Sequence, residues 1–364
     1  MRIFVAAMTI CLLLPHAASA QRERRISPER LEQIRNYLAG RNEESIPAQI
    51  DPQNSELYGT EAGTFSFEAH EFDLDDATRG KTLPLRITVP EVEGALPLIV
   101  HCHGAGGSRD GYEPLVEHWA SHGYVVIQPT FGDSISLLTP AERREFGSIG
   151  DFVNSPAVTR VWNERPQDVT FLLDSLDRLE ETIPELKGKI DREKMAVTGH
   201  SYGAHTTMLL SGLDIPGVGQ QLSEPRFQCA IAISPQGTGG LFQPAGYKSI
   251  RGPILMITGD NDGTPRRGRE SSKGEWRKEA FDHLAPGEKY LLWIDGAHHN
   301  FGGISGVRTR ANTGPVAPDH SLLVKSTTLT FLDCYLKGNS VAKDALHSPE
   351  FRQRAADLAS LTVK

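Results

Sequence analysis

The sequence predicts an α/β fold built around a mostly parallel central sheet with helices on both faces. Short apolar segments, typical of buried parallel strands, alternate along the chain with segments of helical periodicity. This alternation favours parallel strands that are joined by helical crossovers. The chain has 364 residues, of which 38% are hydrophobic and 23% charged, and this composition is typical of folded domains rather than of disordered chains.

The predicted elements begin with two half-buried strands, one near residues 64–69 and one at 81–90. A denser apolar strand follows at 96–101. Strands and helices then alternate as far as a long C-terminal helix, and residues 131–160 have no regular pattern. The later strands are expected at 124–127, 195–198, 229–233, 254–258 and 290–294, and the helices at 112–122, 167–181, 204–210, 276–284 and 322–336.

The N-terminal residues 1–20 have the three parts of a signal peptide. These are the positive charge of Arg2, the apolar run Ile3–Leu14 and the A-x-A cleavage pattern Ala18–Ala20. An uncleaved membrane anchor is the alternative, but the apolar run is short for a membrane span. We therefore expect cleavage after Ala20, a periplasmic or secreted protein, and no integral membrane segment once the signal is removed.

Three further segments are expected in the mature chain. Residues 21–60 predict a short helix, with Ser27 as its cap and Pro28 in its first turn, followed by a linker. Residues 61–340 predict one large α/β domain. Residues 341–364 predict a helical C-terminal tail.

Charge and cysteine content restrict the partners and the cross-links. The formal net charge is −8, and acidic and basic residues are interleaved without a long basic patch, so nucleic acid is not an expected partner.

Removal of the signal would leave Cys102, Cys229 and Cys334, which cannot all pair internally. We expect them to be buried small side chains. One disulfide can form after export, and the sequence does not indicate which two cysteines would form it.

The pentapeptide Gly199-His200-Ser201-Tyr202-Gly203 lies between a predicted strand and a predicted helix. A strand, a sharp turn with a central serine and a helix form the context of a nucleophile elbow. The flanking glycines fit because larger side chains would collide with the adjacent elements in such a strained turn. The alternative interpretation is a glycine-rich turn that has only a structural role and no catalytic residue.

A second glycine-rich turn, at residues 102–108, follows the strand at 96–101. Backbone N–H groups of such a turn can stabilise a developing oxyanion. A phosphate loop is disfavoured because the lysine of a P-loop is missing. His101 and His103 share one face of the strand, but a metal site lacks the carboxylates that such a pair would need. The sequence therefore predicts neither a metal nor an organic cofactor.

An acidic loop at 259–264 and a histidine-containing loop at 295–303 each follow a separate predicted strand. The order along the chain is therefore Ser, Asp, His, which the α/β-hydrolase arrangement uses. A serine hydroxyl becomes nucleophilic when a base takes its proton, and a histidine can take and return that proton near neutral pH. A buried carboxylate then holds the imidazole in the correct tautomer.

Together these motifs resemble the serine-type α/β hydrolases known as predicted dienelactone hydrolases, which are related to platelet-activating-factor acetylhydrolase-like proteins and, more distantly, to polyester-hydrolysing cutinases. The segments 109–112 and 165–169 fit this group as well. The resemblance covers about residues 64–338 and implies an α/β-hydrolase fold with little or no cap. The chain differs from true dienelactone hydrolases, whose nucleophile is a cysteine.

The resemblance implies that Ser201 is the nucleophile, Asp262 the acid and His299 the base. Asp260 is the alternative acid, although turn capping is its other interpretation. His298 is the alternative base and is otherwise expected to be a loop residue near the pocket.

The oxyanion hole is expected to consist of the backbone N–H groups of Ala105 and Tyr202. The side chain of Tyr202 either lines the acyl pocket or serves only in packing. We expect His200 to pack beneath the turn and His205 to be structural.

The expected function is that of a secreted serine carboxylic-ester hydrolase that forms an acyl-enzyme on Ser201 and acts on a small-molecule or polymeric ester. A serine peptidase and an acyltransferase with the same triad are the alternatives, and a non-catalytic binding module is a third. The short segment 234–250 leaves no room for a large helical cap, so we expect an open cleft for short or accessible esters. Residues 131–160 can form part of one wall.

Overall fold

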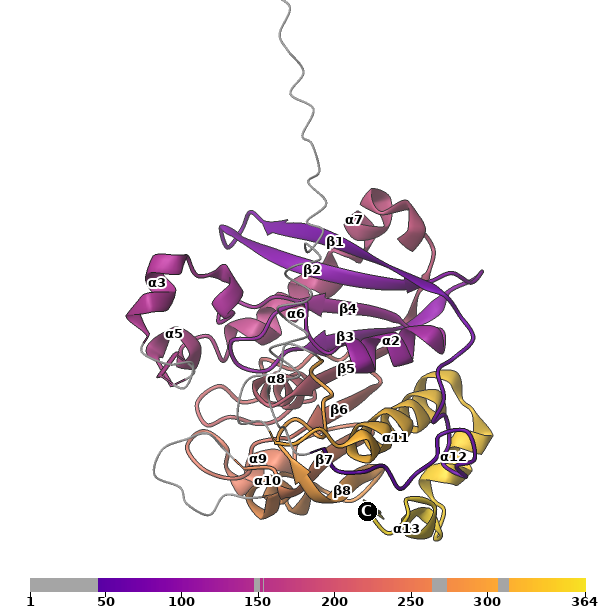
Figure 1. The fold of residues 1–364 in the computed structure, drawn as a ribbon. Helices are drawn as coiled ribbons and strands as arrows, with labels where there is room; N and C mark the ends of the chain where they lie inside the picture. The colour runs from indigo at the N-terminus through magenta and orange to yellow at the C-terminus, as the bar shows by residue number, and fades with distance from the viewer. Residues whose placement is uncertain (1–44, 147–150, 153, 264–273, 307–313) are drawn as a thin grey trace, which may run out of the picture. The chain divides into compact units, whose positions relative to one another are not determined.

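The computed structural model describes residues 45–146, 151–152, 154–263, 274–306 and 314–364. In this part of the chain, nine strands form one sheet in the order β1-β2-β4-β3-β5-β6-β7-β8-β9 (Figure 1). The strands from β4 to β8 pair in parallel, whereas β1, β2 and β9 pair antiparallel with their neighbours. The prediction of a mostly parallel sheet is therefore confirmed. The strands are Phe67–Asp76 (β1), Lys81–Pro90 (β2), Leu96–Cys102 (β3), Val125–Pro129 (β4), Ile190–His200 (β5), Cys229–Ile233 (β6), Ile254–Asn261 (β7), Lys289–His298 (β8) and Ala359–Val363 (β9).

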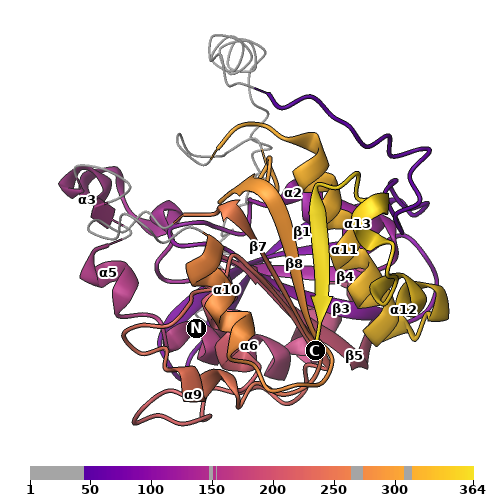
Figure 2. The same ribbon diagram turned by 90° about the horizontal axis from the view of Figure 1, so that it is seen from below.

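Helices cover both faces of the sheet, as Figure 2 shows from below. One face packs against Glu113–Ser121 (α2) and Pro318–Lys337 (α11). The other face packs against Glu164–Asp174 (α6), Leu176–Thr182 (α7), Tyr202–Leu210 (α8), Pro244–Tyr247 (α9) and Gly274–Asp282 (α10). The single helix that the sequence predicts at 167–181 is thus divided into α6 and α7.

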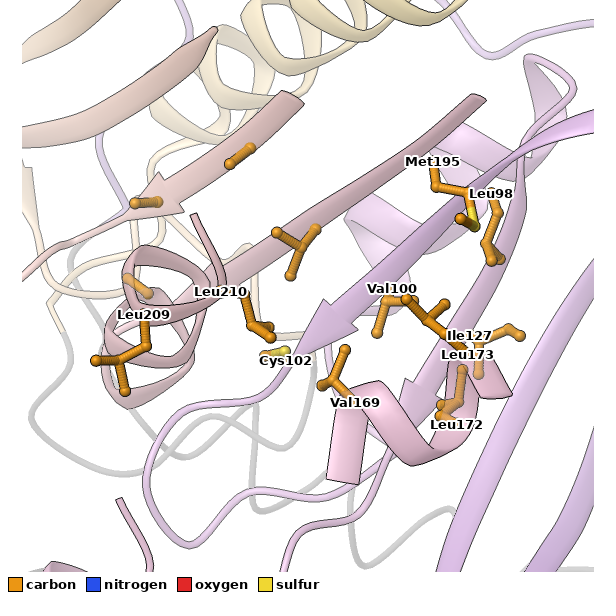
Figure 3. Close-up of a cluster of buried hydrophobic side chains, with 14 of the residues drawn as sticks. Leu98, Val100, Cys102, Ile127, Val169, Leu172, Leu173, Met195, Leu209 and Leu210 are labelled. Atoms are coloured by element: carbon orange, nitrogen blue, oxygen red, sulfur yellow. The ribbon is translucent and has the colours of Figure 1, made fainter. Parts of the chain in front are cut away.

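The core follows from the alternation of side chains along each strand. In β3, Leu98, Val100 and Cys102 point to the layer of α6 and α8, whereas Ile99 points to the layer of α2 and α11. Figure 3 shows the first layer, where side chains of β3 and β5 meet those of α6 and α8. Each fully buried Val, Leu or Ile side chain contributes about 1.5–3 kcal/mol of hydrophobic stabilisation.

The parallel strands end at one edge of the sheet, where the candidate functional loops begin. Cys102 pairs with Gly199, and His200 pairs with Ile233, so β3, β5 and β6 end in register. Ligands of open α/β sheets bind beyond the carboxyl ends of the strands. The loops that follow β3, β5, β6, β7 and β8 can therefore contribute to a single site.

Residues 45–60, which the sequence analysis assigns to a linker, pack against α11. Ile50 and Leu57 are buried, and the backbone N–H groups of Gln49 and Ile50 donate to the carboxylate of Asp319. These two buried side chains and the hydrogen bonds to Asp319 hold the segment in place, although it has no regular secondary structure. The predicted signal peptide at 1–20 and the predicted helix after Ser27 lie outside the described residues.

The C-terminal tail is not helical throughout, and in this respect the prediction for residues 341–364 is wrong. Two short helices, Ser340–Leu346 (α12) and Phe351–Arg354 (α13), precede the edge strand β9. β9 pairs with the otherwise open edge of β8, from Ile294 opposite Ala359 to Tyr290 opposite Val363. This pairing satisfies backbone groups of β8 that an open edge would leave without partners.

Two sequence expectations about connections also bear on the site. Between β6 and β7 the chain forms only the short helix α9, so no large helical cap lies there. Residues 131–160 contain the short helices Ile135–Leu137 (η1), Pro140–Glu145 (α3) and Pro156–Thr159 (α5) within their described part.

None of the helices described is long and apolar enough to span a bilayer. Cys102, Cys229 and Cys334, all within the described ranges, are not joined in disulfides, and the first two are buried.

Candidate active site

The turn between β5 and α8 holds Ser201 in a strained backbone conformation, with φ 58° and ψ −114°. The N–H of Ser201 donates to the carbonyl of Ile233 at 2.9 Å, which ties the turn to the end of β6. A Cβ atom at Gly203 would lie 1.9 Å from the carbonyl oxygen of Cys102, and one at Gly199 would lie 2.3 Å from that of Gly203. Gly203 is therefore required for the turn to pass close to the end of β3, and Gly199 for β5 to pass close to the start of α8.

The structure brings the three predicted residues Ser201, His299 and Asp262 into one hydrogen-bonded line. The Nε2 atom of His299 lies 3.0 Å from the Oγ of Ser201, and its Nδ1 lies 2.7 Å from Oδ1 of Asp262. The serine follows β5, the aspartate follows β7 and the histidine follows β8. These distances are within the range needed for proton transfer between a hydroxyl and an imidazole.

The carboxylate of Asp262 is fully buried and surrounded by donors. Arg277 in α10 places its Nε 3.0 Å from Oδ1, and the hydroxyl of Thr258 donates to Oδ2 at 2.9 Å. Burial acts to raise the pKa of Asp262, but the charge of Arg277 and the hydrogen bonds from His299 and Ser234 outweigh it and lower this pKa to about 2. Asp262 is therefore ionised at all pH values near neutrality.

Ser234 and Arg277 are site residues that the sequence analysis missed. The hydroxyl of Ser234 donates to Asp262 at 2.8 Å and lies 2.9 Å from Nδ1 of His299. Arg277 also donates to the backbone carbonyls of Asp262, Ser234 and Pro235. Ser234 had one usable signal, because it directly follows the strand between the elbow strand and the acid strand. Arg277 had no such signal, since it lies within an amphipathic helix.

The alternative acid and base lie outside this line. The carboxylate of Asp260 accepts the backbone N–H of Gly296 in β8 at 2.5 Å, so it bridges two neighbouring strands and does not cap its own turn. His298 is the last residue of β8 and pairs with Asn261. Within the described residues, no hydrogen bond joins His298 to Ser201 or Asp262.

The glycine-rich turn after β3 lies directly against the serine. A Cβ atom at Gly104 would be 3.5 Å from the Cβ of Ser201. Ala105 directly follows Gly104 and Tyr202 directly follows Ser201, so the two predicted oxyanion residues are the chain neighbours of the residues that meet at this contact. The N–H of Gly106 donates to the carboxylate of Asp133 at 3.1 Å.

Arg165 connects this turn to Tyr202. Its guanidinium donates twice to Asp133, at 2.6 and 2.7 Å, and once to the backbone carbonyl of His103, at 2.7 Å. It also lies over the ring of Tyr202, 4.5 Å from the centroid. The hydroxyl of Tyr202 donates to the carbonyl of Val158, so this side chain is held by packing and a hydrogen bond. Arg165 and Asp133 together fix the shape of the turn.

The remaining histidines near the site are engaged with other protein groups. His101 lies 2.7 Å from the hydroxyl of Thr198, and His103 accepts the N–H of Phe131 at 3.0 Å. His205 packs between aromatic rings, 4.5 Å from that of Phe242. Across the described ranges, no group of three His, Cys, Asp or Glu side chains has the arrangement of a metal site.

Comparison with known proteins gives the family. A sequence model of the family described as Chlorophyllase matches residues 58–239, half of the chain. The chain belongs to the chlorophyllase family. This family consists of serine α/β hydrolases, so the predicted fold and the stated resemblance are confirmed. The matched segment includes Ala105, Ser201 and Tyr202 but ends before Asp262 and His299.

The individual relatives fall into two groups by name, platelet-activating factor acetylhydrolases and chlorophyllases. Platelet-activating factor acetylhydrolase of Cavia porcellus is 26% identical over 232 residues, which is 56% of this chain and 48% of the relative. The enzyme of the same name from Canis lupus familiaris is 31% identical over 163 residues, 38% of this chain and 34% of the relative. Chlorophyllase-1, chloroplastic, of Citrus unshiu is 30% identical over 128 residues, 35% of this chain and 32% of the relative. The chain thus spans between about a third and a half of the length of these three relatives.

Proposed function

We propose that this member of the chlorophyllase family hydrolyses carboxylic esters through an acyl-enzyme on Ser201. The observation that carries the proposal is the continuous line from the hydroxyl of Ser201 through the imidazole of His299 to the buried carboxylate of Asp262. A nucleophile, a base and a group that orients the base are the requirements of this chemistry.

In the proposed reaction, Nε2 of His299 takes the hydroxyl proton of Ser201 while Oγ attacks the ester carbonyl. The negative charge on the resulting tetrahedral oxygen is stabilised by the N–H groups of Ala105 and Tyr202. The carbon–oxygen bond to the alcohol breaks, and the alcohol leaves with the proton that His299 holds. A water molecule then gives a proton to His299 and attacks the acyl carbon. The bond from this carbon to Oγ breaks, His299 returns the proton to Oγ, and the acid and Ser201 are released.

The printed names of the relatives support a hydrolytic reaction on an ester, since one group is named for the removal of an acetyl group. Only the short helix α9 lies between β6 and β7, which favours an open site and an ester with a short or accessible acyl group. A series of p-nitrophenyl esters of increasing acyl length tests this preference. Faster turnover of long acyl chains than of acetate would contradict an open, shallow site.

The first test of the reaction is Ser201→Ala. Loss of the only nucleophile in the proposed line should reduce turnover of p-nitrophenyl acetate by about a million-fold, as for removal of a triad serine elsewhere, which in practice is complete loss. A fluorophosphonate probe should label the unaltered chain at Ser201 and leave the variant unlabelled. Retained turnover in a folded Ser201→Ala variant would exclude Ser201 as the nucleophile.

A pair of adjacent histidines tests the base. His299→Ala should lower kcat by at least about a thousand-fold because the serine then has no group to take its proton. His298→Ala is the matched control, since it removes the same side chain one position earlier and should leave most of the activity. The reverse order of the two variants would transfer the role of base to His298.

The proposal extends to location and to the acceptor of the acyl group. The signal-like residues 1–20 support export, and N-terminal sequencing of the exported protein should then begin at Gln21. A panel of esters, lactones and peptides, with Ser201→Ala as the control, distinguishes an esterase from a peptidase. Added alcohols distinguish hydrolysis from acyl transfer, because a transferase would yield a new ester instead of the free acid.

A further inference from the structure

His200, which directly precedes Ser201, belongs to a second hydrogen-bonded chain that the proposed reaction does not use. Its side chain is buried, with 5% of its surface exposed. Its Nε2 atom lies 2.7 Å from the backbone carbonyl oxygen of His299, and its Nδ1 lies 2.9 Å from the hydroxyl of Tyr112. The backbone N–H of Gly104 donates to the same hydroxyl at 3.1 Å. This chain joins the glycine-rich turn to the loop of the proposed base.

The chemistry of the groups fixes the direction of every proton in this chain. A carbonyl oxygen only accepts, so Nε2 of His200 must carry a proton. Burial, followed by the nearby His299, lowers the pKa of His200 well below its ordinary value, so the imidazole is neutral and its Nδ1 is an acceptor. The hydroxyl of Tyr112 therefore donates to Nδ1, and its oxygen accepts the N–H of Gly104.

Packing holds the members of the chain in place. The ring of His200 lies 4.7 Å from that of His299 and 5.7 Å from that of Tyr112, in the second case edge to face. Tyr112 has a backbone φ of 69°, and its N–H donates to the carbonyl of Ser305 at 3.2 Å. A bulky residue in this conformation persists only where its surroundings compensate the strain, so the contacts of Tyr112 hold its backbone in place.

We propose that Tyr112 and His200 are positioning residues that hold the oxyanion turn and the loop of the base at a fixed separation. The inference rests on the proposed function. Gly104 directly precedes Ala105, whose N–H is one of the two proposed oxyanion donors, and His299 is itself the proposed base. Charge stabilisation and proton transfer occur in the same transition state, so both groups must be aligned at once, and a misplacement of about 1 Å can cost about 100-fold in rate.

The decisive variant is Tyr112→Phe, which removes one hydroxyl and keeps the ring. We expect kcat for p-nitrophenyl acetate to fall by about 10-fold to 100-fold, with KM changed by less than about 2-fold, because the loss acts on transition-state alignment. The matched control is Tyr290→Phe. Tyr290 is also buried, but it lies at the opposite end of β8 from His298, and its hydroxyl lies 2.7 Å from that of Tyr335. This control should keep its kcat even where its melting temperature falls as much as that of Tyr112→Phe.

A boronic acid adds a readout that a purely structural role would not change. It forms a tetrahedral adduct with the serine, so its inhibition constant should rise in Tyr112→Phe by the same factor by which kcat/KM falls. At the second member, His200→Gln keeps a donor in place of Nε2–H, whereas His200→Leu does not. The glutamine variant should therefore retain more activity than the leucine variant.

The outcomes separate the inference from the proposed function. An active wild type together with a Tyr112→Phe variant of unchanged kcat would overturn the positioning role alone. Equal losses of kcat in Tyr112→Phe and Tyr290→Phe would overturn it as well, since the effect would then follow stability. A wild type that neither hydrolyses esters nor reacts with a fluorophosphonate would overturn both.

Discussion

Two buried arginine–aspartate pairs support the site, and they act on different parts of it. Arg277 contacts Asp262 with its Nε 3.0 Å from Oδ1, and Arg165 contacts Asp133 with its Nη2 2.6 Å from Oδ2. All four side chains are almost completely buried. Asp262 also contacts the imidazole of His299, whereas Asp133 contacts the backbone N–H of Gly106.

The difference shows that burial and ion pairing do not by themselves identify a catalytic carboxylate. Both pairs have the same electrostatic character, because burial acts to raise the pKa of each aspartate, and the charge of the partner arginine together with hydrogen bonds from neighbouring groups lowers it overall. Only Asp262 contacts a group whose charge changes in the proposed reaction. Asp133 instead determines the shape of the glycine-rich turn, so its contribution to catalysis is indirect.

Among variants of the two pairs, the largest expected effect is on activity, and it separates the two aspartates. Asp262→Asn should lower kcat for p-nitrophenyl acetate by about 10⁴-fold, because an amide no longer holds the imidazole of His299 in the required tautomer. Asp133→Asn should lower kcat by no more than about 100-fold to 1,000-fold, the cost of a displaced oxyanion donor. Kinetic measurement of the two purified variants under the same conditions checks the difference.

The two substitutions are matched controls for each other, since each replaces a buried carboxylate by an amide of the same shape beside an arginine. Circular dichroism of both variants verifies that they are folded before their rates are compared. An equal loss of kcat in two folded variants would mean that the contact with His299 has no special role.

The sequence alone predicted the residues of the hydrogen-bonded line but not those that support it. Ser201, Asp262 and His299 each follow a strand within a short recognisable motif, so local pattern and chain order located the three loops, and the family resemblance selected Asp262 over Asp260 and His299 over His298. The supporting residues have no such motif. Asp133 lies in a segment without periodicity, and Arg277 lies in an amphipathic helix, so only the fold reveals which backbone groups they contact.

The same limit explains the errors in the fold. The parallel strands were predictable because buried strands are recognisable as continuous apolar runs. β9 was not, because its strand conformation depends on the open edge of β8, which is distant in sequence. Residues 45–60 were also not predictable, because their order depends on Asp319 and the surface of α11.

The next prediction compares how much the two arginine–aspartate pairs contribute to the stability of the folded chain at acid pH. The pKa of Asp262 is about 2 in the folded chain, below the ordinary 3.8. Its contribution to stability is therefore complete above about pH 4 and is lost as the pH falls toward 2, a loss of about 2 kcal/mol in the free energy of unfolding. Urea unfolding at several pH values in this window should show a shallower decline for Asp262→Asn than for the wild type.

Asp133→Asn should show a shallower decline of the same sign, because the pKa of Asp133 is also lowered in the folded chain. The two pairs would then be alike in folding and different only in catalysis. A wild-type decline that neither substitution reduces would assign the acid sensitivity to other carboxylates.

The smallest expected effect concerns the hydrogen bonds to Asp262, and it is tested at Ser234. Ser234→Ala removes one of the donors to Asp262 and the hydroxyl beside Nδ1 of His299. Loss of this bond should lower kcat by about 5-fold to 10-fold, which corresponds to about 1 kcal/mol. Thr258→Val is the matched variant, because it removes a donor to the oxygen of Asp262 that does not contact the imidazole. A larger loss in Thr258→Val than in Ser234→Ala would indicate that the charge on Asp262, rather than the orientation of the imidazole, limits the rate.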